Sequence, residues 1–330
     1  MGRRAILLTG LVVACVLGAV AYVVVSVTSA TDTTASGPAR AVGLPDAPYL
    51  VFRTLDRDDP GNYGHLAVAP LGNLEDRTVS TASCERLHVA GGRGICVQLA
   101  GRVPLRYRAR ILDGDLVPRD SVPLQGFPSR ARVSPDGRLG SVTSFVSGHS
   151  YAELGVFSTE TTIIDLTSGT VVIDNLEDVP IDRDGERVDS IDANLWGVTF
   201  APDSDAFYAT LSTGGRTYLV KGSVRGGRMN VVRENAECPS LSPDGDRVVY
   251  KKREGGDRLW RFTMLDLATM RETPLAETAS IDDQVEWIDA GTVAYRNGEA
   301  LWSVPADGSG RPTRLTSGAD SPAAVQVPET

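Results

Sequence analysis

The chain has 330 residues and a formal net charge of −9, and 42% of its residues are apolar, which is ample for a folded core. The length exceeds one average domain, yet all-β propellers and barrels commonly reach this size as one unit. The acidic balance and the short, mixed charge runs argue against nucleic-acid binding, because phosphate binding needs a concentrated basic surface.

The first 28 residues predict a cytoplasmic stub followed by a transmembrane helix. After "MGRR" comes an uncharged run over residues 5–28, "AILLTGLVVACVLGAVAYVVVSVT", which is long enough to cross a hydrocarbon core of about 30 Å. A cleavable signal peptide usually has a shorter apolar region, so the run favours an uncleaved signal anchor. Secretion after cleavage near Ala30 is the alternative. Because Arg3 and Arg4 should stay in the cytoplasm, we expect a single-pass protein of the cell membrane with an extracytoplasmic C-terminal domain. The helix would be its only contact with the membrane.

Residues 29–47 are rich in Thr, Ser, Ala, Gly and Pro and predict a flexible linker between membrane and domain. Outside the membrane, cysteines can oxidise. Cys84 and Cys96 bracket "ERLHVAGGRGI", an apparent hairpin, so we expect a disulfide between them, with Cys238 left over. Three buried free thiols are the alternative.

A turn followed by a strand recurs along the second part of the chain. The copies are "VSPDGRLGSVTSF" (133–145), "FAPDSDAFYAT" (200–210), "LSPDGDRVVY" (241–250) and "WIDAGTVAY" (287–295). A third strand follows each copy, and a polar turn then leads to a fourth. Four short strands in every period of about 40–50 residues are typical of a β-propeller.

The remaining segments bring the number of blades to six. Residues 84–124 supply four strands, whereas the segment that begins at Tyr49 supplies only three. The missing innermost strand can come from "SGADSPAAV" (317–325), which would close the ring and remove two exposed sheet edges. The predicted fold is therefore an all-β, six-bladed propeller over residues 48–330, closed by a C-terminal strand and preceded by one transmembrane helix.

The repeats carry a resemblance to a known family. Ser-Pro-Asp-Gly at 134–137 and 242–245, followed by "LWRFTMLDLATMRETPLAE", resembles the TolB-like six-bladed propellers with WD40-like repeats, over about residues 48–325. "ECPSLSPDGDRVVYKKR" is similar to membrane-anchored or exported TolB-like translocation proteins of actinobacteria. The resemblance implies extracytoplasmic protein–protein interaction. A permanent anchor departs from a freely soluble propeller, so the role of the Tol system is not carried over.

Two sets of repeat residues have predicted structural roles. Asp-Gly suits a tight hairpin turn, because glycine adopts positive φ and aspartate bonds the turn backbone. The turn residues are Asp136, Asp203 and Asp244. Tryptophans among strand residues at matching positions are expected to pack between blades. These are Trp260, Trp287 and Trp302.

A binding face is predicted where the chain exceeds the repeat. Because strands alternate in direction, loops between second and third strands emerge on the same face as the crossovers between blades. The insertions at residues 55–65, 147–157 and 174–196 should therefore gather around one channel mouth, and long loops on a rigid scaffold are where binding usually resides. The predicted binding residues are His149, Tyr151, Arg187, Asp192, Trp196, Glu237 and Asp283, of which the last three belong to starts of innermost strands.

Motifs for catalysis and cofactors are weak. "DRDG" (182–185), with Glu186, Asp189 and Asp192 nearby, offers oxygens for Ca²⁺ but departs from the EF-hand pattern, so a solvated acidic loop is favoured and no cofactor is expected. The three histidines lack zinc-site spacing.

Two functions follow from these features. The first is a monomeric, membrane-tethered module, without catalysis, that binds a protein or a cell-envelope polymer. The alternative is a lyase or glycosidase acting on envelope polysaccharide, with Asp192, Glu237 and Asp283 as scattered acids at the mouth.

Overall fold

The computed structural model describes residues 41–102, 104–146, 158–255 and 259–327. The predicted transmembrane helix and most of the predicted linker lie outside these residues. In the described part of the chain, no helix is long and apolar enough to cross a membrane. Val42, at the end of the predicted linker, is 7% exposed and packs with Leu44 against the first two blades. The boundary predicted at residue 48 therefore omits residues that belong to the packed domain.

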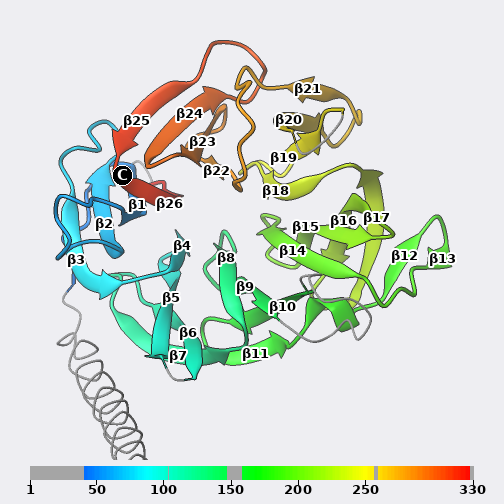
Figure 1. Cartoon of the computed structure of the whole chain (residues 1–330), viewed down its shortest axis with the longest axis horizontal. Coiled ribbons are helices and arrows are strands. Elements are labelled where there is room, and N and C mark those ends of the chain that lie inside the picture. The colour runs from blue at the N-terminus through cyan, green and yellow to red at the C-terminus, as the bar shows by residue number, and fades with distance from the viewer. Residues whose placement is uncertain (1–40, 103, 147–157, 256–258, 328–330) are drawn as a thin grey trace, which may run out of the picture. The chain divides into compact units, whose positions relative to one another are not determined.

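The described residues form six sheets arranged as the blades of a ring, and each blade runs from an innermost strand at the channel to an outermost strand at the periphery (Figure 1). In that order, blade 1 contains β26 (Ala319–Val325), β1 (Tyr49–Thr54), β2 (His65–Pro70) and β3 (Thr78–Ser83). Blade 2 contains β4 (Arg86–Ala90), β5 (Arg93–Arg102), β6 (Leu105–Leu112) and β7 (Pro118–Leu124). Blade 3 contains β8 (Phe127–Val133), β9 (Leu139–Val146), β10 (Ser158–Asp165) and β11 (Thr170–Ile173).

The other half of the ring follows the same pattern, with one addition. Blade 4 contains β14 (Asn194–Phe200), β15 (Ala206–Thr213), β16 (Arg216–Ser223) and β17 (Arg228–Glu234), then β12 (Ile181–Arg183) and β13 (Glu186–Arg187). Blade 5 contains β18 (Glu237–Leu241), β19 (Arg247–Arg253), β20 (Trp260–Asp266) and β21 (Glu272–Pro274). Blade 6 contains β22 (Glu286–Trp287), β23 (Thr292–Asn297), β24 (Ala300–Pro305) and β25 (Thr313–Ser317). A 3₁₀ turn, η1 (Leu176–Asp178), precedes β12.

Blade 1 is built from two distant parts of the chain. Strand β26 runs antiparallel to β1, with Val325 opposite Tyr49 and Ala319 opposite Thr54. The last strand of the described chain is therefore the innermost strand of the first blade, and both edges of β1 are hydrogen-bonded because β2 pairs on its other side.

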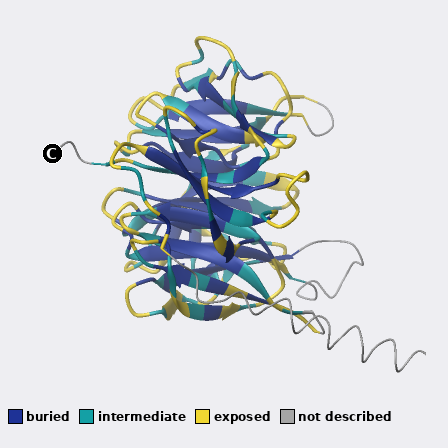
Figure 2. Cartoon of the chain, turned by 90° about the vertical axis from the view of Figure 1, so that its left-hand side faces the viewer, coloured by how far each residue is buried: buried dark blue, intermediate teal, exposed yellow. Residues whose placement is uncertain are grey.

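Packing between neighbouring blades forms the core. Six hydrophobic clusters are found among the described residues, and each joins one pair of adjacent blades around the ring. Tyr250 and Phe207, for example, are almost fully buried in blades 5 and 4. Figure 2 shows the strands buried through the middle of the ring, whereas exposed residues gather in loops on its two faces. Alternate apolar residues on each strand thus hold the blades together.

The repeated aspartates shape turns, as predicted. Asp136 Oδ1 accepts hydrogen bonds from Ser134 Oγ at 2.6 Å and from the Arg138 N–H at 2.9 Å. Asp244 repeats this pattern with the Ser242 hydroxyl and the Asp246 N–H, while Asp203 Oδ1 accepts from the Asp205 N–H at 3.0 Å. These bonds close the turns between the first and second strands of blades 3, 5 and 4.

One glycine permits close contact between blades 2 and 3. Gly91 has a φ of +54°, and a Cβ atom there would lie 2.2 Å from the backbone nitrogen of Gly137. Its neighbour Gly92 also has positive φ, +70°, but open space around the corresponding position. The hairpin turn of blade 2 therefore packs directly against the Ser-Pro-Asp-Gly turn of blade 3.

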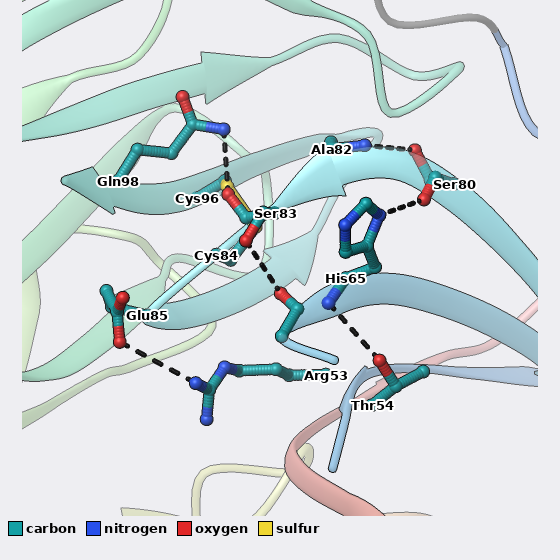
Figure 3. Close-up of a disulfide and its surroundings, with 11 residues drawn as sticks. Arg53, Thr54, His65, Ser80, Ala82, Ser83, Cys84, Glu85, Cys96 and Gln98 are labelled. Carbon is teal, nitrogen blue, oxygen red and sulfur yellow. Dashed lines mark hydrogen bonds and ion pairs between the residues drawn. A yellow bond between two sulfur atoms is a disulfide. The ribbon is translucent and has the colours of Figure 1, made fainter. Parts of the chain in front are cut away.

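The predicted disulfide joins Cys84 and Cys96, with Cα atoms 5.3 Å apart and both residues buried (Figure 3). Cys84 lies in the connection from blade 1 to blade 2, and Cys96 lies in β5. The Gln98 side-chain amide donates to the Ser83 carbonyl at 2.8 Å beside the bond. The disulfide thus fastens the crossover between the two blades to the second strand of blade 2.

Candidate binding pocket at the channel mouth

The centre of the ring opens into a cavity of about 1050 Å³ on the face where the innermost strands begin, which we call the mouth face. Residues from the starts of all six innermost strands or from just before them line the cavity, because each blade points the same end of its first strand to this face. They include Arg86, Arg130, Trp196, Glu237, Asp283 and Asp320.

The cavity is net positive although the chain is net negative. Among the residues that the structure describes, six cationic side chains and four carboxylates line it. The cations are Arg86, Arg130, Arg132, Lys251, Arg253 and Arg296, and the carboxylates are Glu237, Asp282, Asp283 and Asp320. A concave wall with an excess of one charge focuses the electrostatic potential and attracts ligands of the opposite sign.

A buried polar network lies at the inner end of the cavity. Arg132 of blade 3 forms an ion pair with Glu286 of blade 6, and both side chains are about 10% exposed or less. His88 of blade 2 accepts a hydrogen bond from the Val133 N–H at Nδ1, and its Nε2 lies 3.3 Å from Glu286 Oε2. Burial lowers the pKa of His88, so the ring is neutral at pH 7. Burial opposes ionisation of Glu286, but His88 and the Arg132 guanidinium lower its pKa.

Blade 5 supplies a wall of charge around an indole ring. Lys251 Nζ lies 4.5 Å from the centre of the Trp260 ring and pairs with Asp282. Glu237, 4% exposed, accepts from Arg253 Nε at 2.7 Å. Burial opposes the charge on Lys251, but the adjacent carboxylates raise its pKa. The Trp260 indole N–H is buried without a hydrogen-bond partner.

The position of Trp260 corrects the prediction that it packs between blades. Trp287 does so, since it is 6% exposed and its indole N–H donates to the Ser240 carbonyl at 3.1 Å across the interface of blades 5 and 6. Trp302 packs against the hydrophobic cluster that contains Trp287. Trp260 is the first residue of β20 and lies on the same side of the strand as Phe262, but beyond the packed part of the interface, where it faces the cavity.

Exposed apolar side chains gather on the mouth face. Of the nine large hydrophobic residues exposed in the described part of the chain, six lie at strand ends or in loops of the mouth face. We call these six the apolar rim: Tyr63, Leu105, Phe127, Phe145, Ile191 and Leu259. The other three lie on the outer strand β11 or in the turn before β21.

The predicted binding residues do not all come together. Trp196, Glu237 and Asp283 line the cavity, as the repeat position indicated. Arg187 instead lies in β13, because the insertion forms a hairpin whose strand β12 pairs in parallel with the outermost repeat strand β17. The expectation that the whole insertion gathers at the channel mouth is therefore wrong for Arg187. His149 and Tyr151 lie outside the described residues.

The three acids of the enzyme alternative are each held by other groups. Asp192 is absent from the cavity lining, and its carboxylate accepts from Thr213 Oγ1 at 2.6 Å and from the Gly214 N–H at 2.8 Å. Hydrogen bonds from Ser190 and Thr213 lower its pKa. The Asp283 carboxylate accepts from the backbone N–H groups of Gln284 and Arg296. Of the three acids, Glu237 and Asp283 line the cavity and Asp192 does not.

The acidic segment that was weighed as a Ca²⁺ loop is an exposed hairpin. Asp184 and Glu186 belong to the turn and second strand of β12–β13 at the outer edge of blade 4. Within the described ranges, no group of three or more His, Cys, Asp or Glu side chains is arranged to hold a metal ion.

Several lining residues were not predicted from the sequence. Arg86, Arg130 and Asp320 belong to innermost strands near the repeat position that indicated Trp196, Glu237 and Asp283, so extending that position to blades 1 to 3 would have found them. Cys238, the cysteine left over, is a buried free thiol in the same wall.

Comparison with known proteins supports this architecture. No protein-family model matches the sequence, and no match is found among curated proteins. Among solved structures, TolB from Acinetobacter baumannii is similar with a TM-score of 0.60 and 18% identity, and the match covers 84% of this chain but 66%, just under two thirds, of that TolB chain. A putative TolB from Agrobacterium tumefaciens has a TM-score of 0.50 at 11% identity, covering 83% and 91% of the two chains. The chain has a six-bladed β-propeller fold similar to that of these TolB structures.

A chain in a nidogen–laminin complex is also similar, with a TM-score of 0.53 at 10% identity and coverage of 85% and 99%. At such identities the likeness concerns the fold. What this propeller binds must therefore be argued from its own residues, and the finer resemblance to actinobacterial proteins stays a prediction.

Proposed function

We propose that the TolB-like propeller is a binding module, without catalysis, that docks a protein partner on its mouth face. The observation that carries this proposal is that the apolar rim lies on the same face as the opening of the charged cavity. Single exposed hydrophobic residues are common on protein surfaces, but their concentration on one face is typical of interaction sites. Aromatic members such as Phe127, 56% exposed, are the kind of residue that anchors interfaces.

The charge of the cavity favours an acidic partner. Six cationic and four acidic side chains line the cavity over the described residues, so a carboxylate-bearing segment entering it would meet a favourable potential. Apolar side chains of the same partner would cover the rim. Electrostatic complementarity of this kind contributes specificity and a faster association rate.

We further propose that docking takes place outside the cytoplasm, with the propeller tethered by the apolar segment at residues 5–28. The buried Cys84–Cys96 bond supports this compartment, because disulfides persist in oxidising environments and are rare in the cytosol. The charge asymmetry of Arg3 and Arg4 before the segment supports the orientation.

The proposal is tested by in-cell crosslinking with the full chain and a rim variant, Phe127→Asp with Leu259→Asp. Its matched control is Val171→Asp with Val172→Asp, which places two charges on exposed positions of β11, away from the mouth face. We expect the same crosslinked protein with the wild type and the control, and its loss from the rim variant. Equal crosslinking by both variants would contradict docking on the mouth face. Recovery of a polysaccharide instead of a protein would show that the partner is a cell-envelope polymer and would contradict the proposed protein partner.

A further inference from the structure

Two arginines of adjacent blades share one backbone carbonyl in the wall of the cavity. Arg86 Nε of blade 2 donates to the Ser129 carbonyl oxygen at 2.7 Å, and Arg130 Nη1 of blade 3 donates to the same oxygen at 3.0 Å. Both side chains line the cavity. The two guanidinium groups are therefore held side by side at the mouth.

Carboxylates offset part of the charge of this pair, Asp320 and Asp283 at Arg86 and Asp283 and Asp282 at Arg130, but the one ion pair that either arginine forms with a described residue is long. Arg86 donates its other bond to a second backbone carbonyl, that of Glu85, at 2.7 Å, and forms no ion pair with a described residue. The nearest carboxylate oxygen to Arg130 belongs to Asp282, 3.9 Å away, and Asp282 is already paired with Lys251. The Arg130 Nε–H is buried and has no hydrogen-bond partner.

Part of this arrangement is costly without a ligand, because burial, together with the charge of Arg130, lowers the pKa of Arg86. Like charges in a partly desolvated wall repel each other, and a buried donor without an acceptor loses its hydrogen bond to water. An anion placed between the guanidiniums would offset both costs. Arginine is suited to this role because its planar group presents paired N–H donors to the two oxygens of a carboxylate or phosphate.

We propose that Arg86 and Arg130 form an oxyanion-binding site in the cavity wall, which takes a carboxylate or phosphate group. The site deepens the proposed function, because it would hold the acidic group of a docked partner, but its geometry stands without that partner. The shared carbonyl of Ser129 fixes the two guanidiniums in one orientation, so that two oxygens of one group bridge them.

The site is tested by isothermal titration calorimetry of the full-length protein in detergent with inorganic phosphate and, separately, with succinate. Potassium chloride keeps the ionic strength constant, so that screening is the same in all titrations. We expect saturable binding of at least one of the two anions by the wild type. Preference for phosphate or for succinate distinguishes the two sources of the oxyanion.

Variants locate the binding. Arg86→Gln and Arg130→Gln each remove a charged donor, and we expect affinity about tenfold or more weaker in both. Arg86→Lys and Arg130→Lys keep the charge but lose the paired donors, so they should weaken binding even where a glutamine variant folds poorly. The matched control is Arg187→Gln, which removes an exposed arginine at the outer edge of blade 4. It should bind as the wild type does.

Two outcomes would overturn the site. The first is absence of saturable binding of both anions by the wild type. The second is equal weakening by Arg130→Gln and Arg187→Gln, which would indicate a general effect of net charge. Either result with partner crosslinking intact would leave docking on the mouth face unaffected. Conversely, anion binding that persists in a rim variant unable to crosslink would separate the two sites.

Discussion

Arg132 and Glu286 form an ion pair between opposite sides of the ring, because β8 belongs to blade 3 and β22 to blade 6. Further bonds hold each partner in place. Arg132 Nη2 donates to the Val285 carbonyl at 3.0 Å, and Glu286 Oε1 accepts from the Ala324 N–H at 3.1 Å. The pair therefore connects blades 3, 6 and 1 at the inner end of the cavity.

Removing one partner should be more damaging than removing both. Glu286→Gln leaves the buried Arg132 charge without its counterion, and the expected loss in the free energy of unfolding is about 3–5 kcal/mol. Arg132→Met combined with Glu286→Gln should be less destabilised than either single variant, because no buried charge remains unpaired. Urea unfolding of the wild type, the single variants Glu286→Gln and Arg132→Met, and the double variant gives the coupling energy. A single variant within about 0.5 kcal/mol of the wild type would contradict a structural role for the pair.

The repeated turns should make stability depend on acid pH. Burial opposes ionisation of Asp244, but hydrogen bonds from the Ser242 hydroxyl and the Asp246 N–H, with the Arg247 guanidinium, lower its pKa from 3.8 to about 2. A pKa lowered by folding contributes stability that is present above the unfolded value and is lost as the pH falls through the folded value. The advantage in Tm of the wild type over Asp244→Asn should therefore shrink between pH 4 and pH 2.

Calorimetry across this pH range measures the effect on Tm. Asp184→Asn serves as the control, because its side chain is 94% exposed at the turn of the outer hairpin. A gap between wild type and Asp244→Asn that stays constant from pH 5 to pH 2 would show that the turn carboxylate contributes no such linkage.

The Cys84–Cys96 bond should stabilise the domain by constraining the unfolded chain. For a link across 12 residues, replacing both cysteines by serine should lower the free energy of unfolding by about 3 kcal/mol. A reductant should destabilise the wild type by a similar amount and leave the double variant unchanged. Denaturant curves with and without reductant test this. Equal sensitivity of both proteins to reductant would show that the effect does not arise from this disulfide.

Two adjacent glycines allow a test of the contact between blades 2 and 3. Gly92→Ala introduces only the strain of positive φ, about 1–2 kcal/mol, because its surroundings are open. Gly91→Ala adds a clash with the Gly137 backbone, so the total loss should reach about 2–5 kcal/mol. The comparison needs only the two unfolding curves. Equal losses would mean that the turns separate at little cost.

The repeat pattern predicted the architecture because each blade carries its own local signals. The turn residues Asp136 and Asp244, the interblade Trp287 and the Cys84–Cys96 pair all act on neighbours that are close in sequence or in the repeat. Such relationships can be read from spacing, since turn chemistry and strand alternation follow the chain.

The sequence-based predictions fail where the position of a residue depends on distant parts of the chain. Arg187 lies at the outer edge of blade 4 because β12 pairs in parallel with β17, with Ile181 opposite Met229. No local sequence pattern predicts this pairing. Trp260 occupies the same side of its strand as buried residues, but the blade interface ends before it, so the cavity becomes its environment. The Arg86–Arg130 pair likewise results from two strands meeting across a blade boundary.

The pairing of β26 with β1 has a consequence for the order of events in biogenesis. The first repeat strand made by the ribosome cannot acquire its inner neighbour until Ala319–Val325 have been synthesised and, under the proposed topology, exported. At about 5–20 residues per second, β1 waits many seconds for this neighbour and meanwhile offers an unpaired strand edge. Blade 1 is therefore complete only when β26 is present. A fragment that lacks β26 would expose the inner edge of β1 to proteases and chaperones.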